Sequence, residues 1–359
     1  MHTIDSDYGV VKIFAKTIEN EAIEQIKSIA NSPIGENAHI RIMPDAHAGA
    51  GCVIGTTMKF NGRVIPNVVG VDIGCGVDAY YIGEDKPDLE KLDNACRNVL
   101  VSGMNARSKA IEPRWQEDFI LSNLWCKDGL KKIEWIKNSL GTLGGGNHYV
   151  ELNESKNGYW LVVHSGSRNL GKQVAEYWQK IANENNGYLE GELASQYLDD
   201  MGLVQLWARA NREYISNTIC EEMEWDTTYS ISSIHNYIDF KDGYVRKGAI
   251  SAHEGQLCII PLNMRDGSLV CIGKGNEDWN CSAPHGAGRV MSRMKAKKTL
   301  SMEEFKAEMS GIYSTTVSKE TLDEAPMAYK TMDDIVANIG PTADIVNIIK
   351  PIYNFKAAE

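Results

Sequence analysis

Hydrophobic and polar residues alternate in short runs along much of the chain. Four stretches combine this period-two pattern with bounding glycines, which is typical of β-strands. They cover residues 38–60, 64–83, 148–167 and 256–273. Between them, the apolar spacing predicts helical segments near residues 19–30, 172–224, 301–310 and 331–339. The pattern therefore predicts an α+β fold in which mixed β-sheets are flanked by helices.

The organisation of the chain favours one interleaved domain over residues 1–359. Of its 359 residues, 43% are hydrophobic and 24% are charged, so the chain can bury a large core. It shows no internal repeat, low-complexity tract or proline-rich linker. The first residues form no basic or apolar targeting run, and no apolar stretch of about 18 residues follows. We therefore expect a cytoplasmic protein that does not enter membranes.

The cysteines and the net charge narrow the chemistry. Eight cysteines occur without a C-x-x-C pair, so we expect reduced, mostly buried thiols and no zinc ribbon. The net charge of −11 argues against a general nucleic-acid coat. A polyanion could therefore bind only at a local basic surface. A run of basic residues could form such a surface, although a solvated helix face is its simplest interpretation. One basic run is present: Arg289, Arg293, Lys295, Lys297 and Lys298.

Two histidines lie in a predicted hairpin. Residues 148–152 and 160–164 resemble strands joined by the turn formers of NESKNG. A hairpin centred on Lys156 would place His148 directly opposite His164, with Cβ atoms about 5 Å apart. It would also put Val150, Leu152, Trp160 and Val162 on one apolar face. Two such histidines could bind one metal or two neighbouring metals, or could be buried and paired with carbonyls.

Further potential ligands stand on glycine-rich loops. Asp72 and Cys75 are three residues apart in the segment GVDIGCGV, and His235 and His285 are followed by small or amide residues. One carboxylate, one thiol and three or four imidazoles are sufficient for a two-metal site. These ligand types suit Zn²⁺, Co²⁺ or Mn²⁺, so they leave the metal open.

Three glycine-rich segments raise the question of a nucleotide. LGGGN, GKGNED and HGAGR could contact phosphate, but none matches the P-loop or the dinucleotide-binding fingerprint. The lysine motif K-x-D-G of nucleotidyl transferases is also missing. A covalent nucleotide adduct would therefore need another nucleophile, and an imidazole can serve.

The motifs taken together resemble the RtcB-type RNA ligase family. They are MPDAHAGAG, VVGVDIGCGV, LGTLGGGNHYVEL, HSGSR, HNY, RKGAISA and HGAGR, in this order, over nearly the whole chain from residue 40. The resemblance implies an enzyme that joins an RNA 3′-phosphate or 2′,3′-cyclic phosphate to a 5′-hydroxyl, in RNA repair or tRNA splicing. It also implies GTP as co-substrate, two Mn(II) ions per chain and a guanylylated histidine.

The resemblance assigns roles to individual residues. Asp72 and His148 would hold one Mn²⁺, His164 and His235 the other, with Cys75 bridging them, and His285 would be the nucleophile. The remaining family positions would contact GTP together with His148, His235 and His285. They are Asn147, Tyr149, Glu151, Asn236, Pro261, Asn263, Met264, Ser268, Gly286, Gly288 and Lys356. RNA would follow the basic run, principally Arg289, Arg293, Lys297 and Lys298.

The chain also departs from the family pattern. Leu262 and Asn263 stand where the family usually has glycine and serine, and Ala50 stands where a lysine is frequent. These changes predict a short, divergent paralogue with an altered nucleotide pocket. Two alternatives follow from the same residues: a metal-dependent phosphodiesterase or phosphatase built on the dinuclear site, and a non-catalytic RNA-binding relative. Retention of all the ligand residues and of His285 argues against the second alternative.

Overall fold

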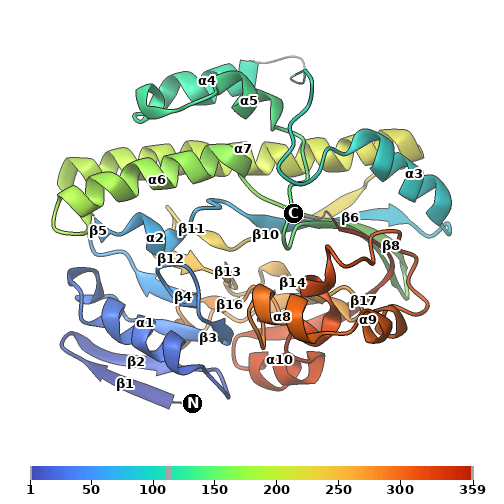
Figure 1. The fold of residues 1–359 in the computed structure, drawn as a ribbon. Coiled ribbons are helices and arrows are strands. Elements are labelled where there is room, and N and C mark those ends of the chain that lie inside the picture. The colour runs from blue at the N-terminus through green and yellow to red at the C-terminus, as the bar shows by residue number, and fades with distance from the viewer. Residues whose placement is uncertain (1, 110, 112–114, 357–359) are drawn as a thin grey trace.

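The computed structural model describes residues 2–109, 111 and 115–356, and it confirms an α+β fold (Figure 1). Its largest sheet has seven antiparallel strands in the order β10-β6-β8-β7-β17-β15-β14. In chain order these strands are β6 (Gly76–Gly83), β7 (Tyr149–Ser155), β8 (Gly158–Ser165), β10 (Tyr229–Ile234), β14 (Leu257–Asn263), β15 (Gly267–Gly273) and β17 (Ala343–Lys356).

A second sheet has six strands in the order β1-β2-β3-β4-β12-β11 and is mixed, because β2 and β3 are parallel. Its strands are β1 (His2–Ser6), β2 (Gly9–Ile13), β3 (Arg41–His47), β4 (Ile54–Lys59), β11 (Asn236–Ile238) and β12 (Tyr244–Lys247). Two short pairs complete the β-structure: β5 (Arg63–Val64) with β9 (Leu189–Glu190), and β13 (Ala249–Ser251) with β16 (Ser282–Pro284).

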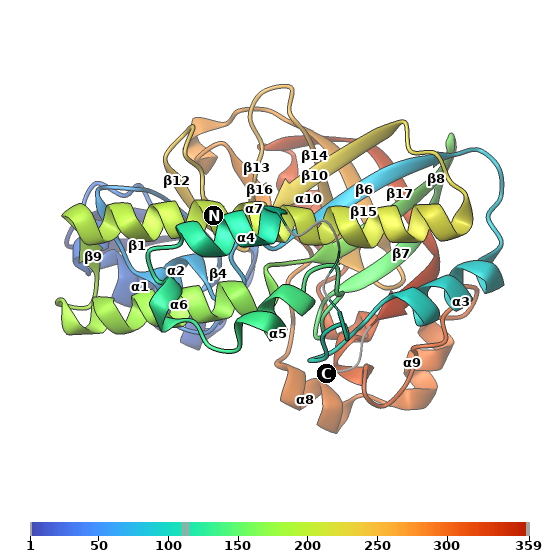
Figure 2. The ribbon, with the colours of Figure 1, turned by 90° about the horizontal axis from the view of Figure 1, so that it is seen from above.

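The helices lie around the sheets. They are α1 (Asn20–Ala30), α2 (Pro66–Val69), α3 (Leu89–Val99), α4 (Trp115–Asn123), α5 (Ile133–Asn138), α6 (Arg168–Glu184), α7 (Gly191–Met223), α8 (Arg293–Thr299), α9 (Met302–Glu308) and α10 (Met332–Ile339). The helices predicted near 19–30, 301–310 and 331–339 are thereby confirmed. Figure 2 shows α6 and α7 side by side, with α4 over α7.

The helical segment predicted over 172–224 is two helices instead of one. The chain reverses after α6, where Asn186 and Gly187 have φ values of 62° and 88°. Glycine and asparagine tolerate this left-handed conformation, so they end the helix where the apolar spacing continues. The antiparallel pair α6–α7 is the result, and it covers the sheets on one side (Figure 1).

The predicted hairpin exists, but its register differs by one residue. Ser155 pairs with Gly158, which leaves a two-residue turn, and Tyr149 instead of His148 lies opposite His164. The shift also separates the predicted apolar face, because a one-residue change moves a strand's side chains to the other side of the sheet. Val150 and Leu152 pack in one core cluster, and Trp160 and Val162 pack in another.

The seven-stranded sheet has in its interior a strand that the sequence pattern missed. Strand β17 pairs with β7 on one side and with β15 on the other. It contains Pro351, which donates no backbone hydrogen bond and is normally confined to edges and bulges of a sheet. The pairing with β7 is irregular between Pro351 and Tyr353, so the proline is accommodated at a bulge.

Helix α7 connects the two largest hydrophobic cores. Its first half contributes Tyr197, Val204 and Trp207 to the core under the six-stranded sheet. Its second half contributes Ile215 and Ile219 to the core against the seven-stranded sheet. Because one helix packs in both cores, it fixes the two sheets relative to each other.

At the junction of these cores, α7 carries buried polar side chains. Arg212 is 1% exposed and forms an ion pair of 2.9 Å with Asp78 of β6. Its guanidinium also donates to the carbonyls of Gly74 at 2.9 Å and Ser165 at 3.4 Å. The neighbouring Asn211 donates to the Ser165 hydroxyl at 2.9 Å. The helix therefore fixes the loop at Gly74 and the end of β8 through their backbone carbonyls.

All eight cysteines are unbonded, and seven of them are buried, which agrees with the expected reduced thiols. Across the part of the chain that the structure describes, no helix combines the length and apolarity needed to span a bilayer.

The buried ion pair generates the first prediction. Arg212→Met keeps the length of the side chain but leaves Asp78 buried without its cation, which typically costs about 3–5 kcal/mol. We expect the free energy of unfolding in urea to fall by about that amount. The matched control is Arg209→Met on the same helix, which removes an exposed pair with Glu213 at 2.7 Å. That variant should lose less than about 1 kcal/mol, and equal losses would contradict the role of Arg212.

Candidate active site

The loop between α2 and β6 positions Asp72 and Cys75. Gly74 within it has φ 71°, and a Cβ there would lie 3.0 Å from the Cα of Gln205 in α7. Only glycine allows this combination of a left-handed backbone and close contact with the helix. The loop is therefore held against α7, and its carboxylate and thiol face the end of the seven-stranded sheet.

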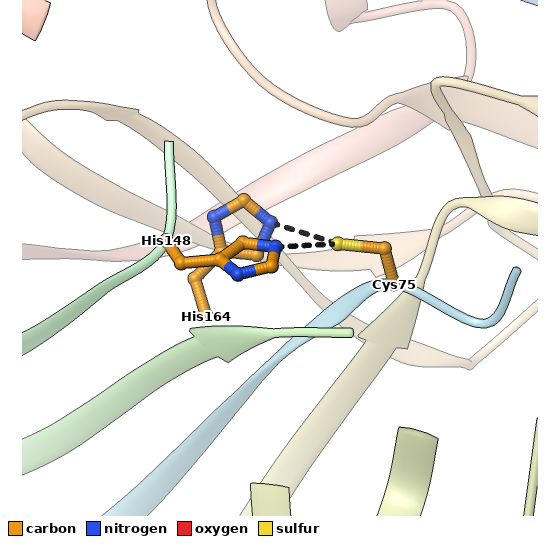
Figure 3. Close-up of side chains that lie close together, drawn as sticks. All are labelled: Cys75, His148 and His164. Atoms are coloured by element: carbon orange, nitrogen blue, oxygen red, sulfur yellow. Dashed lines mark hydrogen bonds between the residues drawn. The ribbon is translucent and has the colours of Figure 1, made fainter. Parts of the chain in front are cut away.

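Cys75 meets two histidines (Figure 3). Its Sγ lies 3.5 Å from Nε2 of His148 and 3.3 Å from Nε2 of His164. The Nδ1 atoms face carbonyls, that of Leu143 for His148 at 2.9 Å and that of Asn147 for His164 at 3.0 Å. A carbonyl only accepts, so both Nδ1 atoms carry the proton and both Nε2 atoms present a lone pair.

His148 reaches this position from the loop before β7. Because it precedes the strand, it does not follow the alternation that places Tyr149 opposite His164. The predicted proximity of the two histidines is present, with ring centroids 5.2 Å apart, although the predicted pairing that suggested it is wrong.

Asp72 completes the first group of potential ligands. Its Oδ2 lies 3.1 Å from Nε2 of His148, and its Oδ1 accepts from the backbone N–H of Ser167 at 2.9 Å. Burial raises the pKa of the Asp72 carboxyl. His148, which can donate to Asp72 from Nε2 only when its ring is protonated, opposes burial together with Cys75 and Arg168, and the pKa lies below its ordinary value. The carboxylate is therefore ionised and oriented at neutral pH.

The imidazoles continue in a row from the ligand group to the predicted nucleophile. Ring centroids are 5.3 Å apart between His164 and His235, and 4.9 Å apart between His235 and His285. The backbone N–H of His235 donates to the carbonyl of Cys75 at 2.9 Å, which ties this residue to the ligand loop. Burial lowers the pKa values of His164 and His235 well below the usual range, so both are neutral bases.

The donor set fits a divalent transition ion. One atom each from Cys75, His148 and His164 lies within 4.8 Å of the others, and all three residues are buried. Imidazole lone pairs fixed by carbonyls at the opposite nitrogen are the usual arrangement of metal-binding histidines. Thiolate, imidazole and carboxylate together suit ions such as Zn²⁺, Co²⁺ or Mn²⁺.

Asp45 orients His285, a contact that sequence analysis missed. Its Oδ2 accepts from Nδ1 of His285 at 2.7 Å and from the backbone N–H groups of His285 and Gly286 at 3.2 and 3.3 Å. The carboxylate is fully buried. The bond fixes the proton on Nδ1, so Nε2 of His285 is a free nucleophilic lone pair. The motif MPDAHAGAG contains Asp45. Because Asp45 lies 240 residues before His285, no local pattern in the sequence predicts their contact.

A cavity of about 210 Å³ opens beside His285. Its wall contains most of the residues that were predicted to contact GTP. They are Asn147, Tyr149, Glu151, His235, Pro261, Asn263, Met264, His285, Gly286, Gly288 and Lys356. Of the others, His148 and Ser268 are buried outside this wall, and Asn236 lines a neighbouring cavity.

The two substituted loop residues are engaged within the protein. Leu262 is buried in a core cluster. The Asn263 side chain closes the turn between β14 and β15, because it accepts from the backbone N–H of Arg265 and donates to Asp266. An altered nucleotide pocket nevertheless stays a prediction.

A cluster of charges forms one end of this cavity. Glu324, 2% exposed, contacts Nζ of Lys356 at 3.0 Å, Arg289 at 3.1 Å and Arg293 at 3.5 Å, and it accepts from the Tyr329 hydroxyl. Burial raises the pKa of Glu324, but the three cations outweigh it and lower that pKa to about 2. Glu324 and Tyr329 are site residues that no motif in the sequence suggested.

The basic run is thus partly turned inward. Arg289 and Arg293 contact Glu324, and Lys297 lies 3.4 Å from the buried Asp323. Lys298 is exposed on α8. Binding of RNA along this run stays a prediction, whereas the interpretation as a plain solvated helix face does not describe Arg289 or Arg293.

Comparisons with known proteins identify the family of this chain. A family model described as "tRNA-splicing ligase RtcB" matches residues 25–119 and 126–357. The chain is 32% identical to the RNA-splicing ligase RtcB of Escherichia coli K12, and the alignment covers 98% of each protein.

More distant relatives carry similar names. RtcB2 of Escherichia coli ATCC 25922 is 27% identical over 94% of this chain and 93% of the relative. The tRNA-splicing ligase RtcB of Nanoarchaeum equitans is 28% identical over 92% and 90%. A family match over most of the chain, together with identity above 30% over nearly its full length, shows that this protein belongs to the RtcB family of RNA ligases.

Proposed function

We propose that this protein joins RNA 3′-phosphate ends, or 2′,3′-cyclic phosphate ends, to 5′-hydroxyl ends through a GMP adduct on His285. The observation that carries the proposal is the contact between Asp45 and His285, which leaves Nε2 of a partly buried imidazole free in the wall of the first cavity. RNA repair or tRNA splicing in the cytoplasm is the proposed setting.

The first chemical step uses GTP. Nε2 of His285 attacks the α-phosphorus, the bond to pyrophosphate breaks, and pyrophosphate takes the electron pair. Nδ1 keeps its proton on Asp45 throughout, so the phosphorylated ring is an imidazolium that the buried carboxylate stabilises. The contact therefore serves both the nucleophile and the adduct.

The next steps consume the adduct. Water first opens a 2′,3′-cyclic phosphate, breaking the bond from phosphorus to the 2′-oxygen and leaving a 2′-hydroxyl and a 3′-phosphate. An oxygen of the RNA 3′-phosphate attacks the same phosphorus and releases neutral His285. The 5′-hydroxyl of the second RNA then attacks the activated 3′-phosphate, loses its proton to a base or to solvent, and expels GMP. A 5′-phosphate has no role in this sequence.

Two Mn²⁺ ions are proposed as cofactors. Asp72 and His148 would hold one ion, His164 and His235 the other, and the Cys75 thiolate both. The position of Sγ between the two Nε2 atoms supports a shared thiolate. The ions would neutralise phosphate charge and so favour displacement at phosphorus.

The inner end of the cavity is proposed to read guanine. Glu151 is buried, and its carboxylate accepts from Nδ2 of Asn354 at 2.7 Å. Lys356, on the same strand as Asn354, lies over the Tyr149 ring at 5.4 Å. A carboxylate accepts from the N–H groups of guanine, whereas the ammonium donates to its carbonyl oxygen, and adenine offers the opposite pattern. Contacts from the other predicted GTP residues, including Asn236 and Ser268, belong to the same proposal.

The test of the proposed function is direct. Incubation with GTP and Mn²⁺ should add one GMP to the protein by mass spectrometry, and His285→Ala should add none. Asp45→Ala should slow adduct formation by roughly 100-fold or more, the scale of a lost orienting or charge-stabilising contact. Labelled RNAs should join only when the 5′ end is a hydroxyl and the other end is a 3′-phosphate or a 2′,3′-cyclic phosphate. Cleavage of cyclic phosphate without any adduct would favour the hydrolase alternative.

The shared thiolate predicts unequal metal loss. Cys75→Ala should lose both ions, because its thiolate contacts both groups of histidines, whereas His164→Ala should keep one of them. Elemental analysis after purification in Mn²⁺ measures this. Cys271→Ala, which removes another buried thiol, is the control. Two tightly bound ions in a folded Cys75→Ala protein, checked by its melting curve, would refute the bridge.

The pKa of Glu151 predicts that the affinity for guanosine, the nucleoside without its phosphates, depends on pH. Burial raises the pKa of Glu151 to about 7, although Lys356 and Asn354 oppose it. Only the ionised carboxylate accepts from two guanine N–H groups, so guanosine affinity for metal-free protein should rise about tenfold from pH 6 to pH 8. Calorimetry measures this affinity. Guanosine is used because it has no phosphate group whose own titration would change the binding.

Two controls accompany that measurement. Glu151→Gln should show a flat pH profile, and adenosine should bind weakly at both pH values. Glu151→Ala should narrow the preference for GTP over ATP by about 1–3 kcal/mol. A guanosine affinity that falls with rising pH would contradict the assignment of Glu151.

A further inference from the structure

Lys330 lies two residues before α10, at a point that the packing of this helix fixes. Helix α10 places Ile335 and Ile339 in a buried core cluster. The hydroxyl of Thr331 accepts from the backbone N–H of Asp334 at 3.2 Å and so caps the first turn of the helix. The backbone just before this cap therefore has a fixed position.

The backbone of Lys330 contacts the loop that carries His285. Its N–H donates to the carbonyl of Gly288 in that loop at 3.0 Å. Gly288 has φ 74°, and a Cβ there would clash with the carbonyl of Asp45 in β3. Only glycine combines this backbone conformation with such a close contact. The loop of His285 is therefore packed between Lys330 and β3.

The side chain of Lys330 contacts β3 on both sides of Asp45. The described ladders pair β3 only before residue 43 and at residue 47. In this gap the Lys330 ammonium donates to the carbonyls of Pro44 at 2.8 Å and Ala46 at 3.3 Å. Carbonyls two residues apart in an extended strand point to the same side, where a neighbouring strand normally supplies the donors. The ammonium thus takes the place of a missing strand.

Asp45 depends on this support from the backbone. Its Oδ2 accepts from His285 and Gly286, whereas its Oδ1 has no hydrogen-bond partner in the described part of the chain. Burial lowers the pKa of Lys330, and the carboxylate of Asp45 opposes that change. Lys330 therefore also places a positive charge near a fully buried carboxylate.

We infer that Lys330 is a positioning residue for the reaction at His285, because its ammonium and its backbone N–H together hold Asp45 against Nδ1 of the imidazole. This inference rests on the proposed function, in which the adduct forms at a free lone pair on Nε2. Without the ammonium, β3 can move away from the loop and Nδ1 loses its acceptor. The ring can then carry its proton on Nε2, where the proton blocks the attack on phosphorus.

The first test removes the ammonium. Lys330→Met keeps most of the apolar stem but has no N–H to donate to β3. Formation of the GMP adduct at saturating GTP should slow roughly tenfold or more, because a misplaced nucleophile loses much of its rate. The affinity for guanosine should change by less than about twofold, since the base contacts stay in place. Mass spectrometry and calorimetry measure the two effects.

The matched control is Lys274→Met. The ammonium of Lys274 also donates to a carbonyl, that of Gly340 just after α10, at 2.7 Å. This variant loses a bond of the same kind near the same helix, and it should keep the wild-type rate of adduct formation.

Proton NMR of the metal-free protein reports on the His285 ring without any turnover. An imidazole Nδ1–H that donates to a buried carboxylate gives a resonance far downfield, and comparison with His285→Ala assigns it. The resonance should be present in the wild type and in Lys274→Met. In Lys330→Met it should be lost or shifted upfield, while the melting curve shows a folded protein.

A cavity of about 400 Å³ allows chemical rescue, because its wall contains Lys330, Pro44 and Ala46. Within the described residues, Arg289 is the one lining residue that it shares with the first cavity. Propylammonium replaces the atoms that Lys330→Ala removes. It should raise the adduct rate of that variant roughly fivefold, the scale of one regained hydrogen bond. Tetramethylammonium, which has the same charge but no N–H, should have no effect.

Each measurement can overturn the inference. A wild-type adduct rate or an unchanged His285 resonance in folded Lys330→Met would do so, and so would equal rescue by tetramethylammonium. A wild type that forms no adduct would refute the proposed function. The NMR comparison would then still decide whether Lys330 positions the imidazole.

Discussion

The site depends on the buried pair between Arg212 and Asp78. Arg212 leaves water only because Asp78 and two carbonyls replace its hydration, and those carbonyls belong to Gly74 and Ser165. Gly74 lies one residue before Cys75, and Ser165 follows His164. One guanidinium therefore holds both a thiol and an imidazole of the ligand group by their backbones. Because α7 is packed in two cores, Arg212 has a fixed position and holds the ligand residues in place.

Hydrogen bonds within the protein also orient the histidines before any ligand binds. Carbonyls fix the tautomers of His148 and His164, and a buried carboxylate fixes that of His285. Nothing about these rings has to reorganise when a cation or a phosphate approaches, which is the condition under which electrostatic contacts contribute most to catalysis. Burial keeps His164 and His235 neutral, so they are available as bases and ligands at physiological pH.

Features that depend on residues close together in the sequence could be predicted, whereas features that depend on contacts between remote segments could not. Local motifs predicted the ligand loop, the hairpin and most cavity residues, because each lies within a few residues of a turn or strand end. The register of the hairpin was missed because NESKNG allows more than one turn, and the ladder is chosen by cores on both faces. The contacts of Asp45 and Glu324, and the interior position of β17 in the sheet, arise only when remote segments pack, and no local periodicity encodes them.

The charge distribution explains how an acidic chain can act on RNA. The net charge of −11 is spread over the protein, yet Arg289, Arg293, Lys297 and Lys356 converge on only two buried carboxylates, Asp323 and Glu324. Within this cluster the four cations outnumber the two anions, and Glu151 adds a third carboxyl group to the wall of the first cavity. A net negative charge over the whole chain opposes the binding of a nucleic acid, whereas a local cluster of cations favours phosphate. Under the proposed function, recognition would then depend on a terminal phosphate and a nucleotide inside the site, and much less on the length of RNA outside.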